Sequence, residues 1–130
     1  MTDPAILAVD AGLAFLHGVG ARALLVFAVL LAIWGTYQYF RNAAVSAGFR
    51  SSYLIMAGLT ALQGLIGLAA FALGGRPTTL LHLVYGAFAV LFLPGAYLYA
   101  HGGSRRREAV ILAGAAWLVS IAYFRGIATG

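Results

Sequence analysis

The sequence predicts an all-α protein, an integral membrane four-helix bundle that runs up and down and forms one domain over residues 1–130. Hydrophobic residues make up 63% of the chain and charged residues only 8%, and the mean hydropathy is +0.96. Soluble domains contain about a quarter charged residues. Four apolar stretches are also present, each close to the roughly 20 residues that cross a bilayer core.

Each apolar stretch is expected to be a helix, because lipid offers no hydrogen-bond partner to an open strand and the alternation of a membrane barrel is missing. The connections between the stretches are too short to hold a soluble domain, so consecutive helices should run antiparallel. The expected helices cover about residues 12–40, 52–73, 79–100 and 108–124.

The first expected helix has a recognisable start. Asp3 is a good N-cap and Pro4 suits the first helical position. A cleavable signal would need positive charge here, whereas the chain has Asp3 and Asp10. Residues 4–15 are then either an extension of the first span or a helix that lies in the membrane interface. Further along, Pro94 is expected to kink the third helix.

The net charge of +5 is explained by topology, so no nucleic-acid partner is expected. The positive-inside rule places the arginine-rich connections in the cytoplasm and both termini outside, in an inner or plasma membrane. The stretch "GGSRRRE" (102–108) should anchor the chain at the headgroups, with a lipid-specific or partner-docking role as the alternative. The arginines of these connections are Arg41, Arg50, Arg105, Arg106 and Arg107.

The chain contains no cysteine, which excludes disulfides and thiolate-bound metals. It has three histidines. His17 and His82 lie near the outer ends of the first and third helices, which run in the same direction, so both are expected at one depth. His101 comes 19 residues after His82, which is about 28 Å along a helix, and a structural role is expected for it. A second site that pairs His101 with Met56 is an alternative.

An ionisable group at membrane depth needs a partner or a function. Small residues share the helical face of each histidine, namely Gly20 and Ala21 after His17 and Gly86 after His82. They either allow close helix packing or leave room for a flat macrocycle beside each imidazole. Two imidazoles at equal depth between apolar walls suit one heme b per chain, with His17 and His82 as the iron ligands. Zinc would need three or four ligands.

The propionates of such a heme should meet basic or hydroxyl groups at the outer face, because charge-assisted hydrogen bonds favour arginine beside a carboxylate. Arg22 lies within the first span, five residues after His17. It either binds a propionate, extends to the interface or pairs with Asp10. The candidates for this contact are Arg22, Arg76, Arg125, Thr78 and Thr79.

Two motifs accompany the histidine pair, "LQGLIG" at 62–67 and "LHLVYGAF" at 81–88. With histidines at the outer ends of the first and third helices, the chain resembles one four-helix half of the heme A synthase family over nearly its whole length. Members of that family usually carry two such units, each with a histidine pair. The resemblance implies that His17 and His82 are axial ligands and that Gln63 takes the place of the family's glutamine.

The chain departs from the family pattern beside the first histidine. Family enzymes typically have a glutamate three residues before it and an arginine directly after it, where this chain has Ala14 and Gly18. The carboxylate thought to help oxidise the heme methyl group is therefore missing.

The sequence is compatible with three functions. The leading hypothesis is a membrane b-type cytochrome without catalytic residues, a small subunit of a larger respiratory or photosynthetic complex, with quinone contact left open. The second is a heme A synthase-like enzyme or a heme-handling assembly factor that acts as a homodimer. The third is a cofactor-free structural subunit in which His17 and His82 are hydrogen-bonded between helices.

Overall fold

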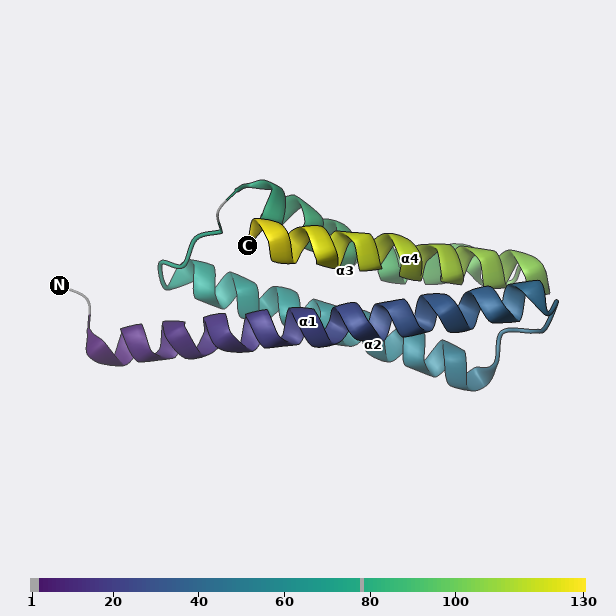
Figure 1. Cartoon of the computed structure of the whole chain (residues 1–130), viewed down its shortest axis with the longest axis horizontal. Helices are drawn as coiled ribbons and strands as arrows, with labels where there is room; N and C mark the ends of the chain where they lie inside the picture. Colours follow the sequence, from purple (N-terminus) through teal and green to yellow (C-terminus); the bar gives the residue numbers. More distant parts are fainter. Residues whose placement is uncertain (1–2, 78) are drawn as a thin grey trace.

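The structure, a computed structural model, describes residues 3–77 and 79–130, and these residues form helices joined by short connections. The helices alternate in direction along one long axis (Figure 1). The predicted all-helical, up-and-down arrangement is confirmed, and each helix is long and apolar enough to cross a membrane. The helices are α1 (Pro4–Phe40), α2 (Ala47–Ala72), α3 (Leu81–Ala100) and α4 (Arg105–Thr129).

Polar N-cap residues mark the starts of α1, α2 and α4, whereas α3 starts after Leu80 without a side-chain cap. Asp3 accepts a hydrogen bond from the Ala5 amide at 2.8 Å, with Pro4 in the first turn as expected. Ser46 caps α2 and Ser104 caps α4, through their hydroxyl groups. Both helices therefore begin before the predicted positions, because the apolar stretches did not include the polar first turns. Helix α4 also continues to Thr129 rather than ending near residue 124.

Residues 4–15 are a continuous extension of the first helix. Helix α1 has 37 residues, which is about 55 Å, and its N-terminal turns extend past the end of α2 (Figure 1). Helix α3 continues unbroken through Pro94 to Ala100, and the kink expected at Pro94 stays a prediction.

Each helix packs against two neighbours: α1 and α3 both lie between α2 and α4. Helices α1 and α3 are therefore diagonal partners across the bundle. At the arginine-rich end an ion pair joins α2 to α4, with Arg50 Nη2 at 2.6 Å from Glu108 Oε1.

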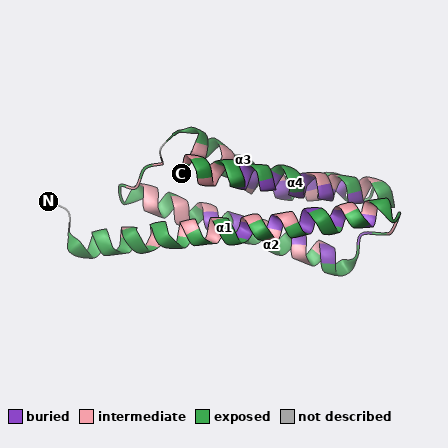
Figure 2. Ribbon diagram, in the orientation of Figure 1, coloured by how far each residue is buried: buried purple, intermediate pink, exposed green. Residues whose placement is uncertain are grey.

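The densest packing lies away from the histidines. The largest fully buried side chains come from α2, α3 and α4, and the buried residues of α1 begin only at Leu24. Figure 2 shows the same pattern, with buried residues gathered from the middle of the bundle to the arginine-rich end. The histidine end is therefore less densely packed than the rest of the bundle. The fully buried large side chains are Tyr53, Phe49, Met56, Leu93, Leu112 and Val119.

Candidate functional site

The structure brings His17 of α1 and His82 of α3 together across the diagonal of the bundle. Their Nε2 atoms are 3.5 Å apart. The ring centroids are separated by 5.7 Å and the ring planes meet at 68°. Both side chains are partly buried. The two imidazoles therefore point their outer nitrogens at one another.

The other ring nitrogen of each histidine faces a backbone carbonyl of a neighbouring helix. His82 Nδ1 lies 2.8 Å from the Gly126 carbonyl oxygen of α4. A carbonyl only accepts, so His82 Nδ1 carries the hydrogen and Nε2 keeps its lone pair. His17 Nδ1 lies 3.2 Å from the backbone carbonyl oxygen of Gln63 and 3.0 Å from its side-chain amide nitrogen, Nε2. His17 thus has partners for either tautomer.

The tautomer of His17 decides whether a proton or metal ion is needed between the two Nε2 atoms. When its Nδ1 donates to the Gln63 carbonyl, two Nε2 lone pairs face each other, and a proton or a metal ion is needed between them. When its Nδ1 instead accepts from the Gln63 side-chain amide, His17 Nε2 donates to His82 Nε2. The second arrangement is a complete hydrogen-bond chain from Gln63 to Gly126 that needs no cofactor.

The spacing of the pair is close to that of two ligands on opposite sides of one metal ion. Metal–imidazole bonds are about 2 Å long, so such ligands hold their nitrogens about 4 Å apart. The observed 3.5 Å is therefore short by about 0.5 Å, which a small outward movement of the rings provides. Within residues 3–77 and 79–130 no three His, Cys, Asp or Glu side chains gather to form a larger ligand set.

A cavity of about 920 Å³ adjoins both imidazoles and has walls from all four helices. Its size lies within the range of roughly 300–1,000 Å³ that is usual for ligand sites. Small residues supply much of its wall. They are Ala14, Gly18, Ala21, Ala61, Gly64, Gly67, Ala70, Gly75, Gly86, Ala87, Ala89, Ala122, Gly126 and Gly130.

The glycines near the pair have different roles. A Cβ on Gly67 would lie 2.8 Å from His17 Cε1, so Gly67 makes room for the imidazole itself. Gly20 approaches Gln63, whose Oε1 would be 2.5 Å from an added Cβ, and it lies outside the cavity lining. Gly86 and Ala21 do line the cavity, and an added Cβ on Gly86 would meet nothing within 4 Å.

Charged residues lie along the rim of this cavity. Arg22 and Arg76 both line it, as does Asp10. Arg22 donates to the Gly18 carbonyl at 3.1 Å, and Arg76 donates to the Phe71 carbonyl at 2.6 Å. Both arginines are exposed, so their guanidinium groups are accessible to an anionic ligand.

The remaining propionate candidates are placed less favourably. Arg125 lies outside the cavity lining, with its guanidinium carbon 6.0 Å from the Tyr85 ring centroid. Thr79 is exposed and also lies outside the lining, and Thr78 is outside the described residues. The alternative pairing of Arg22 with Asp10 is absent from the described residues, whose ion pair is Arg50–Glu108. One carboxylate oxygen of Asp10 is buried without a hydrogen-bond partner there.

His101 lies at the other end of α3 from His82. It is the exposed C-cap residue of that helix, as expected for a residue that does not share the His82 site. Met56, the residue considered as its partner, is fully buried in the core.

Sequence reasoning missed the groups that orient the two rings. The Gln63 side chain was noted only as a family position, yet it contacts both Nδ1 and the backbone carbonyl of His17. A glutamine inside an otherwise apolar stretch is a readable signal for such a contact. The Gly126 carbonyl had no such signal, because every residue carries a backbone carbonyl whatever its side chain is.

No family model, curated protein or solved structure matches the chain. The resemblance to half of a heme A synthase therefore stays a prediction from two short motifs.

Proposed function

We propose that the protein is an integral membrane b-type cytochrome, which holds one heme between His17 and His82 and transfers single electrons. The observation that carries this proposal is the facing pair of Nε2 atoms, 3.5 Å apart, beside a cavity of about 920 Å³. A bound heme would supply an iron that gains and loses one electron, with a potential set by its ligands and surroundings.

The residues around the pair would orient each imidazole as an iron ligand. The Gly126 carbonyl accepts from His82 Nδ1, which directs the Nε2 lone pair toward the centre of the bundle. The Gln63 carbonyl can do the same for His17. Such partners of a ligating histidine fix its tautomer and increase its basicity.

The cavity rim has charges that suit the two propionates of a heme. Arg22 and Arg76 line the cavity and are exposed, so either guanidinium group can bind a carboxylate through charge-assisted hydrogen bonds. This contact would also orient the macrocycle, with the propionates at the histidine end of the bundle and the apolar edge inside it.

The proposed setting is a bilayer, with both termini outside and the arginine-rich connections in the cytoplasm. Four helices of sufficient length and hydropathy support membrane insertion. Many large apolar side chains are exposed on the outside of the bundle, which suits contact with lipid, with other subunits of a respiratory or photosynthetic complex, or with a second copy of the chain. Quinone contact belongs to the same proposal.

The cofactor-free structural subunit is the second candidate, because one specific observation favours it. The Gln63 amide, His17, His82 and the Gly126 carbonyl can form a complete hydrogen-bond chain. A heme A synthase-like activity has less support, since Ala14 and not a carboxylate occupies the position three residues before His17.

The visible spectrum of the purified protein tests these candidates. We expect sharp reduced-minus-oxidised bands of a low-spin heme and about one extracted heme b per chain. A protein that stays colourless after expression with ample heme would support the structural subunit instead. Conversion of added heme O in the presence of a reductant would support the enzyme.

A further inference from the structure

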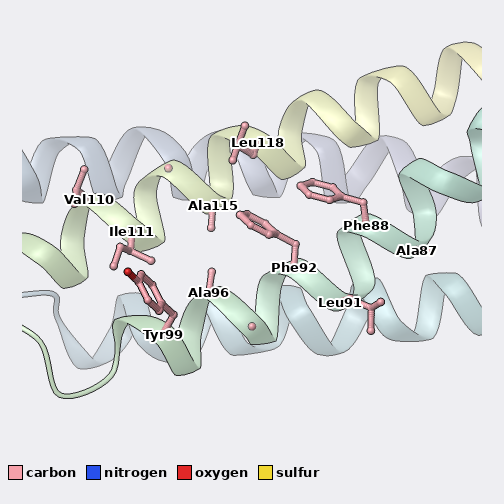
Figure 3. A pocket seen from close by; sticks show the side chains of 12 residues that line it. Ala87, Phe88, Leu91, Phe92, Ala96, Tyr99, Val110, Ile111, Ala115 and Leu118 are labelled. Carbon is pink, nitrogen blue, oxygen red and sulfur yellow. The ribbon is translucent and has the colours of Figure 1, made fainter.

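A second cavity lies on the outer surface between α3 and α4. It shares Ala87 and Leu91 with the lining of the histidine cavity and extends from there along α3 to Tyr99. It has a volume of about 690 Å³ and is called the α3/α4 groove here. Figure 3 shows aromatic and aliphatic side chains of the two helices along it. Among the described lining residues, none is charged. The large side chains are Phe88, Leu91, Phe92, Tyr99, Val110, Ile111 and Leu118.

Two glycines keep this groove open. Gly95 and Gly114 line it from opposite helices, and a Cβ on either one would meet nothing within 4 Å. Close helix packing therefore does not require them. A larger side chain at either position would occupy the groove.

One end of the groove is positively charged. Tyr99 lines the groove near the end of α3, and the Arg107 guanidinium lies over its ring at 4.5 Å from the centroid. Arg106 instead lies over Tyr39 of α1 at 4.3 Å, and Tyr39 does not line the groove. The nearby Glu108 is already paired with Arg50. Neither Arg106 nor Arg107 has an acidic partner among the described residues.

The length of the groove matches one leaflet of a bilayer. On α3 it extends from Ala87 to Tyr99, which is about 18 Å at about 1.5 Å per residue. Half of a hydrocarbon core of about 30 Å is about 15 Å. An apolar chain that starts at Arg107 would therefore end near the middle of the membrane.

The groove is too narrow to enclose a helix. A volume of about 690 Å³ over about 18 Å gives a mean cross-section of about 40 Å². An α-helix is about 10 Å wide, with a cross-section of about 80 Å². A partner helix would remain on the rim, whereas extended hydrocarbon can enter.

We propose that the α3/α4 groove binds an anionic phospholipid, with an acyl chain in the groove and the phosphate on Arg107. The guanidinium of Arg107, over the groove residue Tyr99, matches the negative headgroup, and basic pockets beside membrane helices are known to recognise such lipids. The proposal requires membrane insertion but no heme, so it can fail or hold independently of the proposed cytochrome function.

Native mass spectrometry of the detergent-purified protein tests the proposal, with phosphatidylglycerol and phosphatidylcholine of identical acyl chains as probes. We expect retained phosphatidylglycerol and several-fold weaker phosphatidylcholine binding. Gly114→Leu should reduce phosphatidylglycerol binding, because its side chain enters the groove. Gly58→Leu is the matched control, since Gly58 is exposed on α2 and also faces open space.

The headgroup contact is tested separately. Replacing Arg107 with glutamine should weaken phosphatidylglycerol binding by about five-fold, from about 1 kcal/mol for a charge near an anionic surface. Arg125→Gln at the opposite end should leave it unchanged. Equal binding of the two lipids, or equal effects of Gly114→Leu and Gly58→Leu, would overturn the proposal. So would a change of oligomeric state in Gly114→Leu without loss of lipid, which would assign the groove to a second copy of the chain.

Discussion

His17 and His82 are separated by 65 residues in the chain, yet their Nε2 atoms lie 3.5 Å apart. They come from α1 and α3, which are diagonal across the bundle, so the pair occupies its centre. Each ring is oriented by a backbone carbonyl of a different helix, Gln63 of α2 and Gly126 of α4. All four helices thus contribute to one small site.

Replacing Gln63 with leucine tests the orientation of His17. The side-chain amide that contacts His17 Nδ1 and its backbone carbonyl would be lost, while the backbone carbonyl of residue 63 remains. The ligating tautomer of His17 donates to that retained carbonyl, and the lost amide supports the competing cofactor-free tautomer. We therefore expect heme affinity to stay unchanged or to rise, and a loss of ten-fold or more, as for removing a partner of a metal ligand, would contradict this assignment of the tautomers. Heme titration followed by visible spectroscopy measures this affinity. Gln38→Leu, at a buried glutamine of α1 far from the site, should leave the affinity unchanged.

Replacing Gly67 with alanine tests the space beside His17. The new Cβ would lie 2.8 Å from His17 Cε1, so the imidazole must move away from its alignment with His82. We expect a loss of low-spin heme and a lower unfolding free energy, by about 1–3 kcal/mol as for other overpacked sites. Gly58→Ala, which faces open space, is the control. Equal spectra for the two variants would contradict the role assigned to Gly67.

A buried hydrogen bond near the cavity predicts a stability effect without a cofactor. The hydroxyl groups of Thr60 and Tyr123 are 2.6 Å apart and both residues are buried. Thr60→Val leaves the Tyr123 hydroxyl unpaired, which should lower the unfolding free energy by about 0.6–2 kcal/mol. Denaturant unfolding in detergent measures this change. A double-mutant cycle with Tyr123→Phe should give a coupling of similar size, and a coupling of zero would show that the contact adds no stability.

The absence of native cysteine allows a direct test of orientation. Ala44 in the first connection and Thr79 before α3 are both exposed. With intact cells, a membrane-impermeant thiol reagent should label Thr79→Cys but not Ala44→Cys, because the arginine-rich connections are expected in the cytoplasm. Permeabilised cells should show both labelled. The reverse pattern in intact cells would place the termini in the cytoplasm.

The sequence was sufficient to predict the four helices and the meeting of His17 with His82. Apolar length identifies a span, and antiparallel connections place the first and third helices in one direction. Helix starts were less predictable, because Ser46 and Ser104 begin their helices with polar turns that hydropathy does not include. The position of Arg125 outside the cavity was not predictable either, since depth alone does not fix which face of α4 it occupies.

The partners of the two rings were the least predictable part of the site. The contact between a ring and a backbone carbonyl, such as that of Gly126, depends on the rotation of the helices and on how closely they approach. Residue type sets neither. The same holds for Gly20, whose small size serves Gln63 rather than the cavity. Small residues at helical spacing predict close approach, but they do not say which side chain enters the space.

The heme content of four proteins tests the proposed site most directly: the unmodified chain, His17→Ala, His82→Ala and His101→Ala. We expect about one low-spin heme per chain in the unmodified protein and in His101→Ala, measured by reduced-minus-oxidised spectra and heme extraction. His17→Ala and His82→Ala should each lose the low-spin spectrum, since each removes one of two ligands. A heme-free unmodified protein, or loss of the spectrum in His101→Ala alone, would contradict heme binding between His17 and His82.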